Sequence, residues 1–263
     1  MPTQVANLTK TIIAEAGLSV VANTLLKGND MAATFDAAVG MPTDLFPCTE
    51  SMLVLMGIDD SSSIRFVQGN TEAVRDGYNL VLDALKESKA DESILITTSC
   101  FNTGVLMPFS LLPDAVRMTP QNYNPRGGTP LFDFTFDLLH TALAKTAEYE
   151  AASIPVRTIT VIITDGADCG STRHTAADVA VLVRDMCLKS EKHIVCAIGI
   201  SDGETDFDDV FEQMGIPAQW RRTATATASD IRSVFEVFSK SVVRASQCAT
   251  SFSQTAAGGF ATP

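Results

Sequence analysis

The sequence predicts an α/β fold, in which a mostly parallel sheet is covered by helices on both faces. Apolar runs short enough for strands buried on both faces occur at 52–58, 156–164 and 193–200. Longer segments with apolar residues at helical spacing alternate with these runs, at 70–85, 131–150, 175–189 and 229–246. The 263 residues are enough for one large domain of this kind, with some chain left over.

The first half of the chain is expected to supply the N-terminal segment and three strands. In order, the pattern predicts a helix, a packed linker, a strand and a second helix over 1–28, 29–50, 52–58 and 70–85. Two further strands are predicted over 93–98 and 105–109. The short link around Asn102 between them favours an antiparallel hairpin at a sheet edge. The connection over 110–128 is long and irregular, which is typical of functional loops.

The second half continues the alternation. In order, the pattern predicts helix, strand, helix, strand and short helix over 131–150, 156–164, 175–189, 193–200 and 207–214. A weakly indicated edge strand over 221–224 precedes a last helix over 229–246, with Ser229 as its expected N-cap. We therefore divide the chain into an N-terminal helix and linker (1–50), one domain (51–246) and a flexible tail (247–263) in which no core is expected.

The composition excludes several function classes. A net charge of −12 and a pI near 4.6 argue against a nucleic-acid partner, because phosphate would be repelled. No apolar run is long enough to span a membrane, and no signal-peptide pattern opens the chain. No two of the six cysteines form a C-x-x-C pair, which argues against a structural zinc site. Because no export signal is found, we expect reduced thiols and a cytoplasmic protein.

The end of the first predicted strand carries a cluster of oxygen donors. Asp59, Ser61 and Ser63 follow the buried run at a spacing of two residues. A carboxylate and two hydroxyls are hard ligands that suit Mg²⁺ or a similar cation. Ligands of open α/β sheets bind beyond the carboxyl ends of the strands, where this loop is predicted to lie. Taken alone, the same residues are equally compatible with a plain polar turn.

Two further loops place donors at the same predicted edge. Thr129 stands between two glycines and Pro130, a residue suited to the first position of a helix, so Thr129 could also be a simple N-cap. Asp165 ends the strand over 156–164 directly before Gly166, which could also be an ordinary Asp-Gly turn. In a parallel sheet these positions fall at the edge that carries Asp59.

Together, the three loops resemble the von Willebrand factor A domain and its metal-ion-dependent adhesion site. The family pattern is Asp-x-Ser-x-Ser, then a Thr, then an Asp, and the chain matches it with Asp59, Ser61, Ser63, Thr129 and Asp165. The resemblance covers about residues 51–246 and implies a Rossmann-like, three-layer fold. It also implies that both serines bind Mg²⁺, or Mn²⁺ or Ca²⁺, directly. The threonine would bind directly or through water, and the aspartates mainly through water.

Two positions depart from the family pattern. Ser62 stands where many members have glycine, and Ile64 where many have methionine. Neither change removes a ligand, although Ser62 is expected to strain the loop slightly. Beyond the motif, the chain is similar to bacterial, intracellular members of the family.

The resulting hypothesis is a protein-interaction module without catalytic activity. Two carboxylates roughly neutralise a divalent cation while hydroxyls add no charge, so the metal stays electrophilic. Mg²⁺ takes six oxygens, and a Glu or Asp of a partner protein is expected to complete the set. The alternatives are a metal-dependent hydrolase, which needs a general base that the sequence does not identify, and an adaptor subunit for an AAA-type ATPase, a role of some intracellular relatives.

Other reactive residues are interpreted as structural. We expect packing or surface roles for His140, His174 and His193, and a packed Trp220. Cys169 is expected to be an exposed thiol close to the metal. The carboxylates that follow the strand over 193–200 are interpreted as a solvated loop and helix start; they are Asp202, Glu204, Asp206, Asp208 and Asp209.

Overall fold

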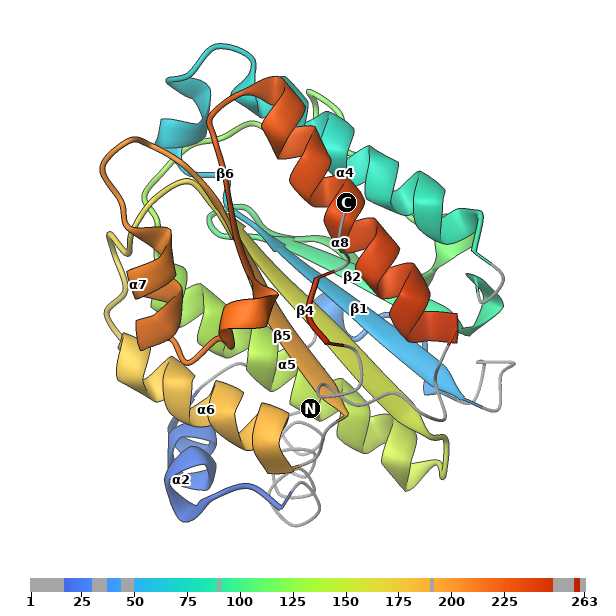
Figure 1. Ribbon diagram of the computed structural model, residues 1–263. Helices are drawn as coiled ribbons and strands as arrows, with labels where there is room; N and C mark the ends of the chain where they lie inside the picture. Colours follow the sequence, from blue (N-terminus) through green and yellow to red (C-terminus); the bar gives the residue numbers. More distant parts are fainter. Residues whose placement is uncertain are drawn as a thin grey trace.

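A six-stranded sheet forms the middle layer of the described part of the molecule (Figure 1). The computed structural model describes residues 17–29, 37–43, 50–88, 91–189, 192–247 and 258–260. The strands are β1 (Ser51–Ile58), β2 (Ile94–Cys100), β3 (Gly104–Leu111), β4 (Val156–Thr164), β5 (His193–Ile200) and β6 (Arg221–Ala224). Their order is β3-β2-β1-β4-β5-β6, and every neighbouring pair is parallel except β2 and β3. The predicted hairpin at the sheet edge is confirmed.

Helices cover both faces of the sheet. On one face α4 (Asn70–Lys86) packs against α8 (Ala228–Gln247). The other face is covered by α5 (Leu131–Ala151) and α6 (Ala176–Lys189), with α2 (Val20–Gly28) outside α6. The short helix α7 (Phe207–Gln213) lies beside β6. Single 3₁₀ turns are η2 (Ser62–Arg65), η3 (Asp91–Ser93), η4 (Leu112–Asp114) and η5 (Ala218–Trp220). The predicted three-layer α/β fold is therefore confirmed.

The central strand β1 fixes helix α5 in place. Every residue of β1 is buried, as expected for a strand with helices on both faces. At Gly57 an added Cβ would lie 2.5 Å from Phe134 Cε1 and 2.8 Å from Leu138 Cδ2. A larger residue at 57 would displace these two side chains, so the glycine lets the start of α5 pack closely against the end of β1.

Several predicted helix starts need correction. Ser229 is not an N-cap, because α8 begins at Ala228 and the hydroxyl of Thr227 accepts the N–H of Asp230 at 3.2 Å. At the N-terminus, residues 1–16 of the predicted helix lie outside the described residues. Residues 17–19 are described but are not helical: α2 begins at Val20, and Ser19 Oγ caps it by accepting the N–H of Ala22 at 3.2 Å. Caps of Ser and Thr one or two residues apart are not distinguishable from composition alone.

The described part of the linker lies along the sheet edge. The N–H of Met41 donates to the carbonyl of Phe109 in edge strand β3 at 2.9 Å. The ammonium of Lys145, which is fully buried, donates to the carbonyls of Val39 and Met41 at 2.9 Å each and to Glu148. Residues 37–43 thus cover part of an edge strand that would otherwise present unpaired backbone groups.

One residue of the expected tail belongs to the core. Phe260 is buried and packs edge-on against Trp220, with ring centroids 5.5 Å apart. Its N–H donates to the carbonyl of Gln219 at 3.0 Å. The expectation that no core residue follows 247 is therefore wrong at Phe260, while Trp220 is packed as predicted. None of the helices formed by the described residues has the length and apolar character needed to cross a membrane.

Candidate metal centre

Four of the five predicted ligands lie in one hydrogen-bonded cluster. Asp59 and Ser61 are almost fully buried after β1, and the N–H of Ser61 donates to Asp59 Oδ1 at 2.7 Å. The hydroxyl of Ser63 donates to Asp165 Oδ1 at 2.9 Å, and that of Ser61 reaches the same oxygen at 3.3 Å. The two serine hydroxyls are 2.9 Å apart. Residues more than 100 positions apart in sequence therefore meet at the carboxyl ends of β1 and β4.

Thr129 lies beside this cluster, on the loop that leads into α5. Its backbone pairs with Cys169, with N–H to carbonyl distances of 3.2 and 2.8 Å. A Cβ built on Gly166 would lie 3.7 Å from Thr129 Oγ1, so the hydroxyl is next to the residue that follows Asp165. Among the described residues, the Thr129 hydroxyl makes no hydrogen bond to the other four predicted ligands. Thr129 thus flanks the cluster, and the polar atoms of the other four form it.

The start of α5 does not use Thr129 as a cap. The helix begins at Leu131, so Pro130 is the residue before it rather than its first residue. The hydroxyl of Ser171 accepts the N–H groups of Phe132 at 3.1 Å and Asp133 at 3.0 Å. Because Ser171 serves as the cap, the alternative of Thr129 as a simple N-cap is wrong. The hydroxyl of Thr129 can therefore serve another purpose.

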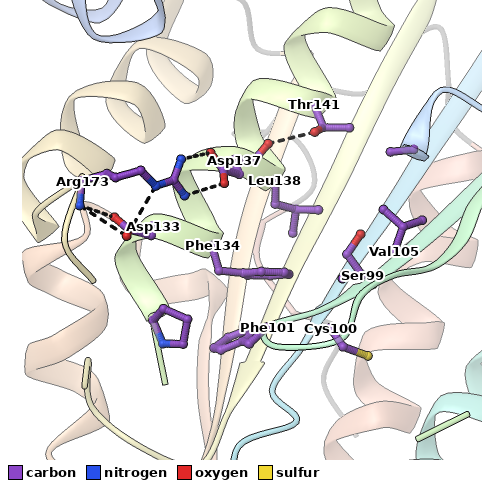
Figure 2. A pocket seen from close by; sticks show the side chains of 13 residues that line it. Ser99, Cys100, Phe101, Val105, Asp133, Phe134, Asp137, Leu138, Thr141 and Arg173 are labelled. Carbon is purple, nitrogen blue, oxygen red and sulfur yellow. Dashed lines mark hydrogen bonds and ion pairs between the residues drawn. The ribbon is translucent and has the colours of Figure 1, made fainter. Parts of the chain in front are cut away.

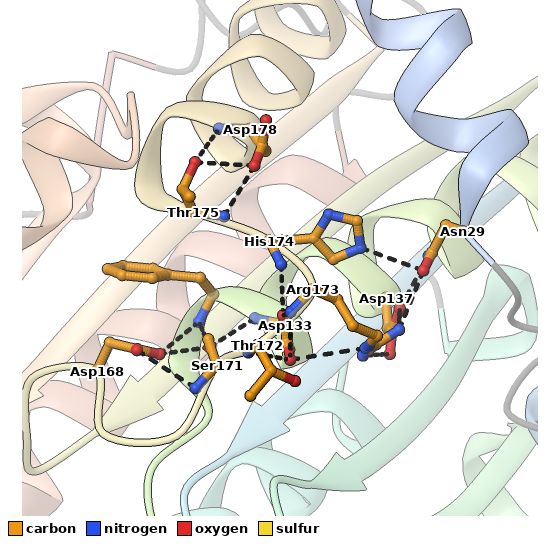
Figure 3. Close-up of polar contacts among 11 residues, drawn as sticks. Asn29, Asp133, Asp137, Asp168, Ser171, Thr172, Arg173, His174, Thr175 and Asp178 are labelled. Carbon is orange, nitrogen blue, oxygen red and sulfur yellow. Dashed lines mark hydrogen bonds and ion pairs between the residues drawn. The ribbon is translucent and has the colours of Figure 1, made fainter.

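A reciprocal clamp fixes this part of the site (Figure 3). While Ser171 caps α5, the carboxylate of Asp133 in the first turn of α5 accepts the N–H groups of Thr172, Arg173 and His174 at 2.7 to 3.0 Å. Burial would raise the pKa of Asp133, but these three donors and the Arg173 guanidinium outweigh it and lower the pKa. The loop after β4 and the start of α5 therefore hold each other in register.

The electrostatics of the cluster are unfavourable for two bare carboxylates. Burial raises the pKa of Asp59, against hydrogen bonds from Thr164 and Ser61. Burial and then the charge of Asp59 raise the pKa of Asp165 to about 6, although Ser63 and Ser61 donate to it. None of the ion pairs found among the described residues involves either carboxylate. A nearby cation would relieve the repulsion.

The donor set fits a hard divalent cation. No three His, Cys, Asp or Glu side chains gather into a metal-binding group within the part of the chain that the structure describes. Any metal at this edge would consequently depend on the hydroxyls of Ser61 and Ser63 together with the two carboxylates. An all-oxygen set of low total charge is what Mg²⁺ or Mn²⁺ takes, whereas Zn²⁺ favours nitrogen and sulfur.

Sequence reasoning missed the residues that hold the loops. Asp60 is fully buried and accepts four hydrogen bonds from Asn102 and Thr103, at 2.6 to 3.1 Å. The amide of Asn102 also donates to the carbonyl of Gly128 at 2.9 Å, which connects the β2–β3 turn to the Thr129 loop. The only sequence signal for this role was that a second aspartate follows Asp59 directly. Because a polar turn tolerates Asp at either position, that signal did not single out Asp60.

Two buried hydroxyls also position Asp59. Thr164 Oγ1 donates to Asp59 Oδ2 at 2.7 Å, and the hydroxyl of Tyr123 donates to the carbonyl of Asp59 at 2.6 Å. Tyr123 lies in the irregular connection over 110–128, so that loop does contribute to the site. The expected strain at Ser62 is absent, because Ser153 is the only non-glycine residue with positive φ in the described ranges.

The other residues weighed from sequence have structural contacts. His174 stacks on Phe136 at 3.8 Å, and Nδ1 of His193 lies 2.8 Å from the hydroxyl of Thr158. Nδ1 of His140 lies 3.4 Å from the amide of Asn29. Asp206 caps α7 and Asp202 closes the preceding turn, as expected of a solvated helix start. The described cysteines at 100, 169, 187 and 196 form no disulfide, and the thiol of Cys169 is exposed, while Cys48 and Cys248 lie outside the described residues.

A cavity of about 210 Å³ lies between α5 and the β2–β3 hairpin (Figure 2). Its floor is apolar, with the rings of Phe101 and Phe134 4.3 Å apart, and Arg173 lies at its polar edge. Pro130 borders it, but none of the five predicted ligands lines it. The cavity is therefore separate from the candidate metal centre.

Solved structures resemble this fold at low sequence identity. The pilus adhesin SpaC from Lactobacillus rhamnosus GG superposes with a TM-score of 0.55 and 13% identity over 74% of this chain and 31% of SpaC. For proximal thread matrix protein 1 from the mussel byssus, the TM-score is 0.49 and the identity 20%, over 76% of this chain and 49% of the mussel protein. For the SpRpn10 VWA domain, the TM-score is 0.46 and the identity 12%, over 70% of this chain and 93% of that domain. The chain spans about half of the mussel protein and a third of SpaC. No protein-family model matches the chain, and no curated protein does.

Strand order, helix layers and the three converging loops define an α/β domain with oxygen donors gathered at one sheet edge. Its topology is the three-layer α/β fold that the resemblance in the sequence led us to expect, and the pilus adhesin SpaC shares this fold.

Proposed function

We propose that the chain is a protein-interaction module that binds an Asp or Glu of a partner protein through Mg²⁺ held by Asp59, Ser61, Ser63, Thr129 and Asp165. The observation that carries this proposal is the meeting of two buried carboxylates and two hydroxyls from separate loops. Their mutual repulsion gives the site a reason to take up a cation.

Each residue has a distinct part in the proposal. Asp59 and Asp165 supply the negative charge, and Ser61 and Ser63 supply neutral oxygens. When bound, Mg²⁺ would offer a coordination position to a carboxylate oxygen. Thr164, which donates to Asp59, and Asp60, which holds the β2–β3 turn, keep the loops in place.

We favour binding over hydrolysis as the proposed activity. Metal-dependent hydrolysis requires a general base close to the reacting water. The described side-chain contacts of the three histidines go to Asn29, Phe136 and Thr158. None of these contacts goes to Asp59 or Asp165. A cytoplasmic site of action, a bacterial origin and a role as adaptor for an AAA-type ATPase stay predictions.

The proposal is tested by titrating Mg²⁺ into the full chain after removal of metals with EDTA. We expect saturable binding by calorimetry and a rise in Tm, because a ligand that binds only the folded state stabilises it. Asp59→Ala should abolish both effects, while the exposed control Asp83→Ala, which removes only a surface partner of Arg117, should retain them.

The partner is then sought by affinity capture in Mg²⁺ with wild type and Asp59→Ala. A partner captured by wild type and lost both in EDTA and in the variant supports the proposal. Absence of Mg²⁺ binding in the calorimeter, or capture that is unchanged by EDTA, contradicts it.

A further inference from the structure

An aromatic side chain stands exposed directly beyond the candidate metal centre. Five large apolar side chains are exposed among the described residues, and Phe66 is the only aromatic one, at 76% exposure. Its neighbour Val67 is also exposed, at 41%. Exposed apolar residues are common singly, but two adjacent ones beside a binding site are a feature of contact surfaces.

Phe66 is not needed to hold its own turn. In the η2 turn, Ile64 is the buried residue that anchors the segment to the core, and the N–H of Phe66 donates to the carbonyl of Ser63 at 2.8 Å. That backbone bond is independent of the Phe66 side chain. The ring thus contributes little to folding, so its exposure calls for another explanation.

The turn with Phe66 lies beside the loop that leads to Thr129. The N–H of Ser62 donates to the carbonyl of Gly127 at 3.1 Å, and the N–H of Arg126 donates to the carbonyl of Asp60 at 2.5 Å. A 3₁₀ turn rises about 2 Å per residue, so Phe66 begins roughly 6 Å along the chain axis from Ser63. A bound peptide of a few residues that reaches Ser63 therefore spans the distance to Phe66.

Two arginines lie on the same pair of loops. Arg65 directly precedes Phe66 and Arg126 directly precedes Gly127, and both are exposed. Neither takes part in the ion pairs found within the described ranges. On a chain with net charge −12, two arginines next to a predicted cation site are available to attract an anion.

We propose that Arg65, Phe66, Val67 and Arg126 form a docking rim for an acidic segment of a partner protein. The segment carries a large apolar side chain, which packs on Phe66 and Val67, next to the carboxylate that occupies the metal centre. The arginines attract the flanking acidic residues of the segment. This inference rests on the proposed function and specifies which partner sequence the site selects.

The test uses a displayed library of random peptides of about twelve residues, selected on the metal-loaded full chain. We expect enriched peptides to be acidic and to place an aromatic or large aliphatic residue close to an Asp or Glu. One such peptide is then synthesised and its Kd is measured by fluorescence anisotropy. Phe66→Ser should weaken binding about tenfold or more, as expected for an aromatic anchor.

Matched variants separate the rim from general surface effects. Val116 is exposed to the same extent as Val67, 42% against 41%, so Val116→Ser should leave Kd within about twofold while Val67→Ser weakens binding. Arg65→Ser with Arg126→Ser should weaken binding most at low salt, and the exposed Arg222→Ser should not.

The outcomes distinguish the rim from the metal. Binding that is lost in EDTA but unchanged in Phe66→Ser overturns the rim and leaves the metal-dependent function standing. Binding that survives EDTA but needs Phe66 supports the rim and contradicts the metal. Enrichment of basic peptides, no enrichment at all, or a Phe66-dependent self-association of the chain without peptide binding overturns the rim.

Discussion

Asp133 and Asp165 are equally buried carboxylates in opposite surroundings. Their exposed fractions are 7% and 5%; Asp133 lies in the first turn of α5, and Asp165 directly follows β4. Asp133 accepts three backbone N–H groups and faces an arginine, and its pKa is lowered. Asp165 accepts two hydroxyls and faces Asp59, and its pKa is raised to about 6.

The difference shows how the fold divides its work. Backbone N–H groups cannot leave, so Asp133 is satisfied permanently and serves as a fixed joint between loop and helix. Hydroxyls can rotate, so Ser61 and Ser63 can turn their lone pairs towards a cation and give up their bonds to Asp165. A rigid clamp beside an adaptable cluster is what a binding site on loops requires.

The comparison is tested most strongly by removing the satisfied carboxylate. Asp133→Ala leaves three N–H groups without their acceptor and removes the weaker of two carboxylate partners of Arg173, so it should lower the free energy of unfolding by about 3 kcal/mol. Urea unfolding in EDTA measures this. Asp83→Ala, which removes an exposed partner of Arg117, should change it by less than about 0.5 kcal/mol. A similarly small effect of Asp133→Ala would show that Asp133 does not hold the loop after β4 against the start of α5.

Removing the strained carboxylate should act in the opposite direction. In EDTA at neutral pH, Asp165→Asn should raise the free energy of unfolding by roughly 1–2 kcal/mol, because it removes repulsion from Asp59 while its amide oxygen still accepts from Ser63. In saturating Mg²⁺ the advantage should vanish or reverse, because wild type gains stability from the ion. A destabilised variant in EDTA would mean that Asp165 is a structural residue like Asp133.

The pH dependence should separate the two aspartates further. The folded pKa of Asp165, about 6, is above the unfolded value of 3.8, so its destabilising effect is complete above about pH 6 and is lost as the pH falls towards 4. The stability gap between Asp165→Asn and wild type should therefore close over that window. Asp133 has a lowered pKa, so its contribution should persist until below about pH 4.

Two buried histidines make a control necessary in that experiment. The pKa values of His140 and His193 are lowered to about 4 by burial, so both reduce stability as the pH falls below 6.5. This change has the opposite sign to that of Asp165, but it is the same in wild type and variant. Only the difference between the two proteins in urea unfolding therefore reports on Asp165, and a gap that stays constant from pH 7 to 4 contradicts the assignment.

The sequence predicted the elements with a regular apolar pattern and the residues that follow the ends of parallel strands. From residue 51 onwards, strands and helices were placed within one or two residues, because β1, buried on both faces, is an unbroken apolar run and α8 carries a regular apolar stripe. The cluster of Asp59, Ser61, Ser63 and Asp165 could be predicted because parallel strands end at one edge of the sheet.

The supporting residues could not be predicted in this way. Asp60 and Asp133 act on backbone N–H groups about 40 positions away, and the direction of a loop's backbone leaves no trace in composition. The cap of α8 at Thr227 lies among several Ser and Thr residues that have similar propensity. Phe260 stands in a tail of mostly small and polar residues, and only the contact with Trp220 reveals its role.

The smallest predicted effect isolates the contact that distinguishes Asp165 from Asp133. Ser63→Ala removes one donor to Asp165, so in EDTA it should lower the free energy of unfolding by about 1 kcal/mol. In the Asp165→Asn background the cost should be smaller, because a neutral amide oxygen accepts a weaker hydrogen bond than a carboxylate. The double-mutant cycle should therefore give a coupling of about 0.5–1 kcal/mol. If the effects of Ser63→Ala and Asp165→Asn are additive, the Ser63 hydroxyl does not stabilise the Asp165 carboxylate. Its contribution to stability would then come from its contact with the Ser61 hydroxyl, 2.9 Å away.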